Sequence, residues 1–253
     1  MEKLKIVVGC NGNIGNYISE YELKRAEKVI GIDINEECIH SNKKNFKYLQ
    51  FDCTKPNFIE NFFREKFKNR SFKIRSLILA AALDSVPIEK KEDNYGYGLS
   101  SQEFHEIHKR IKVNITSQIY MLKVFEDYLY DKSHVCLFSS IYGVRSPDHN
   151  IYSNNFIKPL EYTTSKSAII GLTKHFAVTS SYLNKGRCNC LILGGIKNHN
   201  HEEEFRKKYL IKVPLKRMAS LEDVYNAYKF LDSEKAAYIT GTSLTVDGGY
   251  TAL

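Results

Sequence analysis

The sequence contains no apolar run that approaches the about 18 consecutive residues of a membrane-spanning helix. Its opening, MEKLKIVVGC, is interrupted by charge too soon to form the apolar segment of a secretory signal. Internal repeats, low-complexity tracts and linker-like stretches are also lacking. These absences argue against a membrane protein and against a chain of several modules. We expect a cytoplasmic protein with one domain over residues 1–253.

The six cysteines form no CxxC pair and no cluster with histidine at the spacing of a zinc site. Cys188 and Cys190 alternate as neighbours on one face of a strand do, so we expect buried, reduced thiols. His199 and His201 stand close together, in a segment that we interpret as a solvated lid. The sequence therefore predicts no metal site.

The formal net charge of +8 lacks the clustering that nucleic-acid binding requires. Basic residues are dispersed in stretches such as FFREKFKNR and EFHEIHKRIK, where glutamates interrupt them. We expect no nucleic-acid partner. Attraction of a phosphorylated, nucleotide-linked or acidic small molecule explains the charge as well.

Short apolar runs rich in β-branched residues alternate with longer amphipathic segments, and 43% of the residues are hydrophobic, enough for a core. The runs lack strict alternation, which indicates strands buried on both faces of a parallel sheet. We expect an α/β, Rossmann-like, doubly wound parallel sheet of about seven strands in a single domain. The expected strands are 4–9, 28–33, 47–52, 76–82, 134–140, 187–194 and 243–249. The expected helices lie around 14–25, 56–69, 101–130, 162–184 and 221–232.

The stretch GCNGNIG follows the first strand and places Gly9, Gly12 and Gly15 at three-residue spacing. At such a turn a dinucleotide pyrophosphate can lie on the helix N-terminus, although a plain tight turn needs the same glycines. Asp33 ends the second strand, 18 residues beyond Gly15, where an acid accepts bonds from the adenosine ribose and repels a 2′-phosphate. The motif therefore predicts NAD rather than NADP.

Further residues at the carboxyl ends of the strands complete the expected cofactor site. Asp52 could hold the adenine amino group, or it could be an ordinary loop acid. The residues that we expect to contact NAD are Gly9, Asn11, Gly12, Asn13, Ile14, Gly15, Asp33, Ile34, Asp52, Cys53, Ala80, Ala81, Ala82, Tyr162, Lys166, Gly195 and Ile196.

Tyr162 and Lys166 are one helical turn apart and would project from the same face of a helix. Tyr152 has Phe156 at the corresponding position and so lacks an activating cation. With Ser140 in SSIYG, Asn114 in VNITS and the terminal YITGTSLTVDGGY, the chain resembles the short-chain dehydrogenase/reductase family from residue 4 to 251.

The resemblance implies a role for each of these four residues. Tyr162 would be the acid/base, and Lys166 would lower its pKa and hold the nicotinamide ribose. Ser140 would hydrogen-bond the substrate oxygen. Asn114 would hold a water that relays protons from Lys166 to solvent. The resemblance thus implies an NAD-dependent enzyme that interconverts a secondary alcohol and a ketone.

Two features depart from the family pattern. The family often has Asn-Asn-Ala-Gly where this chain has only alanines at 80–82, so we expect the side-chain support of the central helix to be lost. The distance from Ser140 to Tyr162 is 22 residues, which is longer than usual for the short members of the family. The extra residues would extend the mouth of the site.

Three segments are expected to form loops on the substrate side, at 83–104, 145–161 and 195–218. Asp84, Tyr142, Arg145 and Tyr152 are the expected substrate contacts. His149 and Lys158, like Arg145, could contact an anion. Alternatively, the lengthened loops could serve interactions unrelated to the substrate.

The long-spaced pattern resembles the branch of oxidoreductases linked to bacterial surface-polysaccharide and flagellin-glycan synthesis, of the legionaminic-acid type. That resemblance implies a small-molecule substrate that is an anionic sugar derivative, and a homodimer or homotetramer formed through the long fourth and fifth helices. A non-catalytic NAD-binding sensor or scaffold on the same fold remains an alternative.

Overall fold

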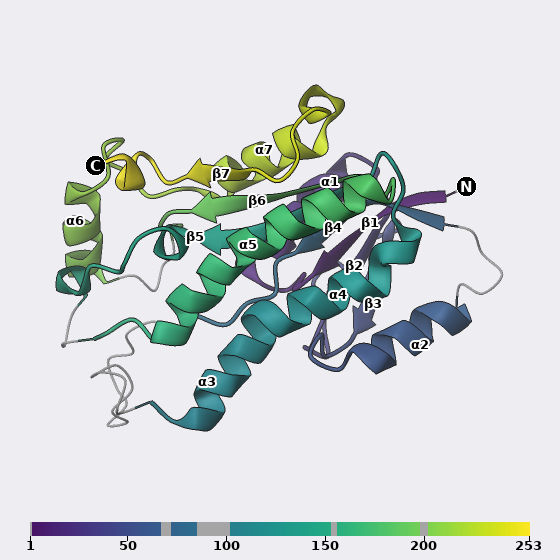
Figure 1. The fold of residues 1–253 in the computed structure, drawn as a ribbon, viewed down its shortest axis with the longest axis horizontal. Coiled ribbons are helices and arrows are strands. Elements are labelled where there is room, and N and C mark those ends of the chain that lie inside the picture. The colour runs from purple at the N-terminus through teal and green to yellow at the C-terminus, as the bar shows by residue number, and fades with distance from the viewer. Residues whose placement is uncertain (1, 67–71, 85–101, 153–155, 198–201) are drawn as a thin grey trace.

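The protein is seen in a computed structural model that describes residues 2–66, 72–84, 102–152, 156–197 and 202–253. Its centre is one sheet of seven parallel strands in the order β3-β2-β1-β4-β5-β6-β7 (Figure 1). The reversal of strand order beside β1 creates a crevice at the carboxyl ends of β1 and β4. The strands are β1 (Glu2–Val8), β2 (Val29–Asp33), β3 (Phe46–Gln50), β4 (Phe72–Leu79), β5 (His134–Ser140), β6 (Arg187–Leu193) and β7 (Ser243–Val246).

Helices cover both faces of this sheet, and Figure 1 shows α4 and α5 in front of the strands. The α-helices are α1 (Asn13–Lys24), α2 (Pro56–Lys66), α3 (Phe104–Ile111), α4 (Ser117–Phe125), α5 (Leu160–Tyr182), α6 (Glu203–Ile211) and α7 (Leu221–Asp232). Shorter turns are η2 (Lys112–Thr116), η3 (Glu126–Tyr128), η4 (Ile141–Gly143), η5 (His149–Ile151), η6 (Glu234–Ala236) and η7 (Tyr250–Ala252). The expected doubly wound α/β fold is confirmed.

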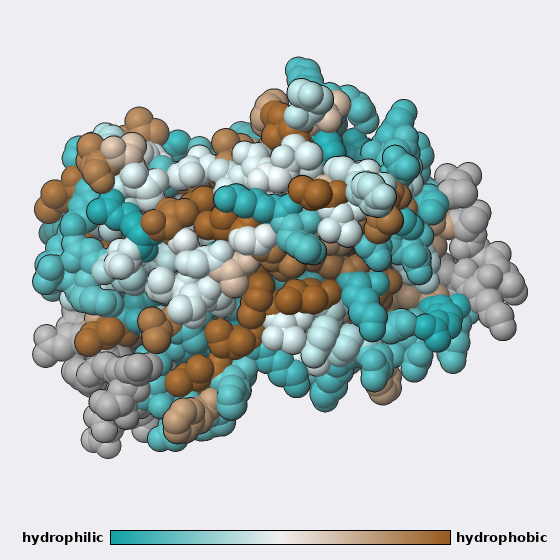
Figure 2. All heavy atoms as spheres, viewed as in Figure 1, coloured by the Kyte–Doolittle hydropathy of each residue, from teal (hydrophilic) through white to brown (hydrophobic). Residues whose placement is uncertain are grey.

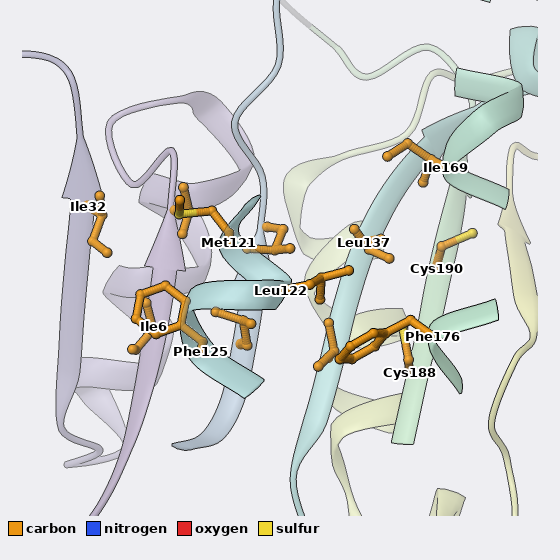
Figure 3. Close-up of a cluster of buried hydrophobic side chains, with 14 of the residues drawn as sticks. Ile6, Ile32, Met121, Leu122, Phe125, Leu137, Ile169, Phe176, Cys188 and Cys190 are labelled. Carbon is orange, nitrogen blue, oxygen red and sulfur yellow. The ribbon is translucent and has the colours of Figure 1, made fainter. Parts of the chain in front are cut away.

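Neighbouring residues of each strand point to opposite faces, which divides the core in two. Ile6 packs in the cluster under α2, α4 and α5, whereas Val7 packs under α1 and α7. Figure 3 shows Phe125 of α4 beside Ile6 in the first cluster. Both faces of the central strands are thus apolar, which is why the sequence shows continuous hydrophobic runs there.

The expected helix over 101–130 is the element that differs most from the structure. It is divided into α3, the π-helical turn η2, α4 and the 3-10 turn η3. A π turn inserts one extra residue into the helical ladder and redirects the side chains around it. Asn114 lies in this turn and is buried. Hydrophobic periodicity alone gives no sign of such an insertion.

Most other elements lie close to their expected positions, but the segment 195–218, expected to be a loop, contains the helix α6. The fifth strand and the last long helix have the expected bounds, whereas β4 begins at Phe72 and ends at Leu79 rather than covering 76–82. All six cysteines are free, and five are buried, as expected for reduced thiols. Among the described residues, no helix has the length and apolar character needed to cross a membrane.

A buried ionic cluster closes the amino-terminal edge of the sheet. Nζ of Lys5 in β1 lies 2.8 Å from Glu22 of α1 and 2.9 Å from Asp232 of α7. Burial opposes the charge on Lys5, but the two carboxylates outweigh it and raise the pKa of the ammonium. Burial also opposes the charge of Asp232, yet the nearby His134 ring and the bonds from Lys5 and Ser76 hold its pKa well below the usual range. The cluster ties both helices of one face to the central strand.

Replacing Lys5 with methionine should destabilise the fold by about 3 kcal/mol, because two buried carboxylates lose a shared cation. Denaturant unfolding of the purified protein measures this loss. Lys28→Met is the matched control, since Lys28 pairs with Glu2 at 2.7 Å on the exposed surface and should change stability little. Equal effects of the two substitutions would contradict the prediction.

Candidate active site

A cavity of about 380 Å³ lies at the carboxyl ends of β1, β2 and β4. Ten of the residues expected to contact a dinucleotide line it: Gly9, Asn11, Gly12, Asp33, Ile34, Asp52, Cys53, Ala80, Ala81 and Ala82. Sequence reasoning missed the remaining lining residues, which are Val8, Ile32, Asn35, Phe51, Thr54, Leu83, Lys109 and Val113. Most of these flank residues that were identified, as Val113 of η2 flanks Asn114, but Lys109 comes from α3 and carries no local motif.

The glycines let three backbone segments meet beside this cavity. Gly9 has a φ of +83°, and a Cβ there would lie 2.6 Å from the backbone nitrogen of Ala81. A Cβ on Gly15 would lie 2.1 Å from the Gly9 carbonyl oxygen. A Cβ on Gly12 would meet that oxygen only at an ordinary 3.4 Å. Gly12 caps α1 and lines the cavity, so the positive end of the helix faces the open space.

Two carboxylates mark the far wall of the cavity. Asp33 at the end of β2 accepts a hydrogen bond from the backbone nitrogen of Asn11 at 3.0 Å, which holds it beside the glycine turn. Asp52 accepts from the backbone and hydroxyl of Thr54 through one oxygen. The second oxygen of Asp52 lies 3.8 Å from the exposed Lys55. Both acids can accept further hydrogen bonds from a bound ligand.

The other expected cofactor residues lie outside the lining of this cavity. Asn13, Ile14 and Gly15 form the first turn of α1. Gly195 follows β6, and its backbone nitrogen donates to the Tyr209 hydroxyl at 2.6 Å. Ile196 forms a bridge with Ala219.

The four residues expected to carry the chemistry come together at the carboxyl edge. Ser140 ends β5, and Tyr162 and Lys166 lie on successive turns of α5. Nζ of Lys166 donates to the Phe138 carbonyl oxygen at 3.0 Å and lies 5.7 Å from the centroid of the Tyr162 ring.

The electrostatics of Tyr162 differ from the sequence-based expectation. Burial raises the pKa of its hydroxyl, the charge of Asp84 raises it further, and a hydrogen bond with Ser140 acts in the opposite direction. Burial also lowers the pKa of Lys166 to about 8. The expected lowering of the Tyr162 pKa by Lys166 is therefore outweighed by burial. Burial thus favours the neutral form of the Tyr162 hydroxyl.

Asn114 clamps the loop after β4. Its side-chain oxygen accepts from the Leu83 nitrogen at 2.7 Å, and its amide nitrogen donates to the Leu83 oxygen at 2.9 Å and to Ser165 at 3.3 Å. Gln118 donates to the Ala81 carbonyl at 2.8 Å. The expected loss of support beside the alanines is therefore wrong, because the helix side chains make the bonds that loop side chains were expected to make.

A second cation lies against Tyr162. Nζ of Lys158 is 4.5 Å from the centroid of the Tyr162 ring and 2.5 Å from the carboxylate of Asp84. Lys158 is buried, whereas Asp84 is half-exposed. Sequence reasoning named Lys158 only as one of several cations, because nothing in its spacing indicated that it would lie over the Tyr162 ring.

Two of the expected substrate contacts have partners within the protein. Arg145 donates to the backbone oxygens of Tyr250 and Leu253, so its guanidinium is held by the C-terminal segment. Tyr152 is buried, stacks on Phe205 and bonds the Tyr142 hydroxyl at 2.8 Å. Tyr142 and Asp84 remain next to Tyr162.

Parts of the expected loops lie outside the described residues, namely 85–101, 153–155 and 198–201, which include His199 and His201. Within the described ranges, no three histidine, cysteine or acidic side chains gather as metal ligands would.

Comparisons with known proteins agree with this geometry. The family model described as Enoyl-(Acyl carrier protein) reductase matches residues 12–251. The 3-oxoacyl-[acyl-carrier-protein] reductase FabG of Buchnera aphidicola is 28% identical, over 98% of this chain and 97% of that protein.

Two solved structures are also similar. A short chain dehydrogenase from Leptospira borgpetersenii with bound NAD+ has a TM-score of 0.84 and 27% identity, covering 99% of this chain and 93% of its own. An aldohexose dehydrogenase from Thermoplasma acidophilum has a TM-score of 0.77 and 26% identity, covering 100% and 95%.

The glycine geometry predicts that replacing Gly15, where a Cβ would clash, destabilises the fold more than replacing Gly12, where a Cβ fits. Gly15→Ala should lower the free energy of unfolding by at least about 2 kcal/mol, because its methyl group overlaps the Gly9 carbonyl. Gly12→Ala should lower the free energy of unfolding by only a few tenths of the loss in Gly15→Ala, since its methyl group fits at a helix cap. Chemical denaturation of both variants compares them, and equal losses would contradict the prediction.

Proposed function

The chain belongs to the short-chain dehydrogenase/reductase family, and we propose that it is an NAD(H)-dependent oxidoreductase that interconverts a secondary alcohol and a ketone. The observation that carries the proposal is the meeting of Ser140, Tyr162 and Lys166 at the sheet edge that also bears the cavity. Asn114 links the two places, because it holds Leu83 of the cavity wall and also bonds Ser165 on the catalytic helix.

The residues around the cavity fit NAD. Gly12 leaves the start of α1 open to a pyrophosphate, and a side chain there would project toward that space. Asp33 would accept bonds from the adenosine ribose, and Asp52 from the adenine amino group. Ala80, Ala81 and Ala82 line the same cavity as these two acids. NAD, when bound, supplies hydride transfer to or from the substrate carbon.

The chain's own residues would handle the proton. Because burial keeps Tyr162 neutral, its hydroxyl can donate to a substrate oxygen that gains negative charge during reduction. The Ser140 hydroxyl would donate to the same oxygen and steady that charge. In the oxidative direction Tyr162 must lose its proton, and the nearby ammonium of Lys166 would favour the phenolate.

Asn114 as a proton relay remains part of this proposal. Its side-chain amide is committed to Leu83 and Ser165, so a relaying water would have to rest on its backbone carbonyl. The π turn η2, which contains Asn114, alters the carbonyl pairing at this point of the helix.

We propose further that the substrate is a sugar derivative, in the service of surface-glycan synthesis. Support comes from the similarity to an aldohexose dehydrogenase and from the polar wall formed by Asp84, Lys158 and Tyr142. The net charge of +8 favours a substrate with an anionic group, such as a phosphate, a linked nucleotide or a carboxylate. A cytoplasmic location would match the supply of such metabolites.

A homodimer or homotetramer through α4 and α5 is also proposed. Apolar side chains on these helices are exposed, among them Ile119, Val178 and Tyr182. Figure 2 shows hydrophobic surface gathered over the face on which α4 and α5 lie. A contact between two copies would cover it.

Tyr162→Phe should reduce turnover by at least about a thousandfold, because the only change is the loss of the proton-donating hydroxyl. Calorimetric NAD binding should be nearly unchanged, which separates chemistry from cofactor binding. The readout is the absorbance of reduced nicotinamide across a panel of sugars, sugar phosphates and nucleotide sugars. Undiminished turnover would overturn the assignment. NAD binding by the wild type with no turnover across the panel would favour the sensor alternative.

Asp33→Asn should shift the ratio of NAD to NADP affinity toward NADP by about tenfold, since the acid no longer repels a 2′-phosphate. Calorimetric titration with each cofactor measures the ratio. Asp52→Asn is the control and should leave the ratio unchanged, because Asp52 would face the adenine. A ratio that moves equally in both variants would contradict the role given to Asp33.

A further inference from the structure

Lys158 and Asp84 form an ion pair beside the ring of Tyr162. Neither residue is among the four that were expected to be catalytic. Lys158 precedes α5, in the segment that lengthens the distance from Ser140 to Tyr162. Its side chain is only 5% exposed, and its ammonium lies over the Tyr162 ring. A buried ammonium needs a counter-charge, and the carboxylate of Asp84 supplies one.

Asp84 is the member of the pair that faces outward. Its side chain is 43% exposed, and it follows β4 at the edge where ligands of this fold bind. Its negative charge acts on Tyr162, Tyr142 and Lys166, so it stands among the groups of the active site. Any substrate whose oxygen reaches Tyr162 would therefore meet a carboxylate close by.

The other acid near Tyr162 is already paired with a different cation. Glu161 lies 3.0 Å from Arg110 of α3, and both side chains are largely buried. Within the part of the chain that the structure describes, Asp84 is thus the carboxylate that combines exposure with nearness to the Tyr162 hydroxyl. Among the described residues, the charged or titratable groups that act on Tyr162, Lys158 or Lys166 include Asp84 after β4, Arg110 of α3, Tyr142 of η4, Tyr152 after η5, and Cys190 of β6.

We propose that Asp84 determines specificity by accepting a hydrogen bond from a hydroxyl group on the substrate carbon next to the reacting carbon. Lys158 is the positioning residue that holds Asp84 and contacts the Tyr162 ring. The inference rests on the proposed oxidoreductase function and deepens it. An ionised carboxylate accepts hydrogen bonds and repels other anions. The anionic group of the substrate, where there is one, lies away from the reacting carbon.

The physical reason for selectivity is the cost of leaving a partly desolvated carboxylate without its partner. A bound alcohol that has no neighbouring hydroxyl would displace water from Asp84 and return no hydrogen bond. A vicinal diol would return one. The site should therefore prefer a vicinal diol to the simple alcohol of the same skeleton, whatever the natural substrate is.

The first experiment measures oxidation of cyclohexanol and of the cis and trans vicinal cyclohexanediols, with NAD, by the wild type and by Asp84→Leu. The expected result is that the wild type prefers a diol and that the variant lowers the ratio of kcat/KM, diol to cyclohexanol, by about tenfold to a hundredfold. Asp84→Asn, which keeps an acceptor oxygen, should fall in between. Asp127→Asn is the control, an exposed acid paired with Lys185 at 3.8 Å, and should not change the ratio.

The second experiment tests the electrostatic contact without a substrate. The protein is labelled with difluorotyrosine, whose pKa is lower than that of tyrosine, and fluorine NMR follows the titration of Tyr162. The Tyr162 signal is the one that is absent from the spectrum of Tyr162→Phe. Lys158→Met should move the titration midpoint of Tyr162 upward, because a cation near a phenol favours the phenolate. Asp84→Asn should move it downward. Lys158→Arg, which restores the charge, should return the midpoint toward the wild-type value.

The outcomes separate this inference from the proposed function. An unchanged ratio in Asp84→Leu, or equal losses on cyclohexanol and on the diols, overturns the role of Asp84. If the wild type oxidises none of the three compounds, the proposed function is contradicted. The NMR experiment alone then tests the contact of Lys158 and Asp84 with Tyr162. Opposite shifts in Lys158→Met and Asp84→Asn support the contact, and unmoved midpoints overturn it.

Discussion

The close contact of three backbone segments at the end of β1 is the constraint on which the rest of this site depends. Gly9, Gly15 and Ala81 leave no room for a Cβ at either glycine. Their contact brings the start of α1 to the sheet edge and sets the loop after β4 beside it. Asn114 and Gln118 then hold that loop from the central helix. Both the cavity and the alignment of α5 with it follow from this packing.

Buried charges serve different purposes at the two edges of the sheet. At the amino-terminal edge Lys5 bonds Glu22 and Asp232, all three are buried, and the result is a rigid tie between β1, α1 and α7. At the carboxyl edge Lys158 is equally buried, but its partner Asp84 is half-exposed. Exposure leaves that carboxylate able to accept bonds from a ligand. The same kind of pair therefore contributes stability at one edge and recognition at the other.

The sequence was sufficient for those features that follow from local pattern. Strand runs predicted the parallel sheet, and the residues at the carboxyl ends of the first four strands predicted ten of the residues that line the cavity. Features set by contacts between distant segments could not be predicted. The π turn at Asn114, the capture of Arg145 by the C-terminal backbone and the burial of Tyr152 are of this kind. The alanines at 80–82 led to the wrong prediction that the central helix would lose its side-chain support. The supporting bonds come instead from Asn114 and Gln118 of the central helix.

The described residues of the lengthened segment before α5 are chiefly packed against the rest of the protein. Tyr152 stacks on Phe205 of α6 and bonds Tyr142, which fixes the segment against the rest of the site. Pro159 then caps α5 with an extended backbone, and a residue before proline is itself kept out of helical conformation. Lys158 therefore cannot continue the helix backward, and its side chain folds over the ring of Tyr162, four residues later. A segment without these anchors could not hold an ammonium against a buried phenol, so the added residues shape the chemistry of Tyr162 as well as the space in front of it.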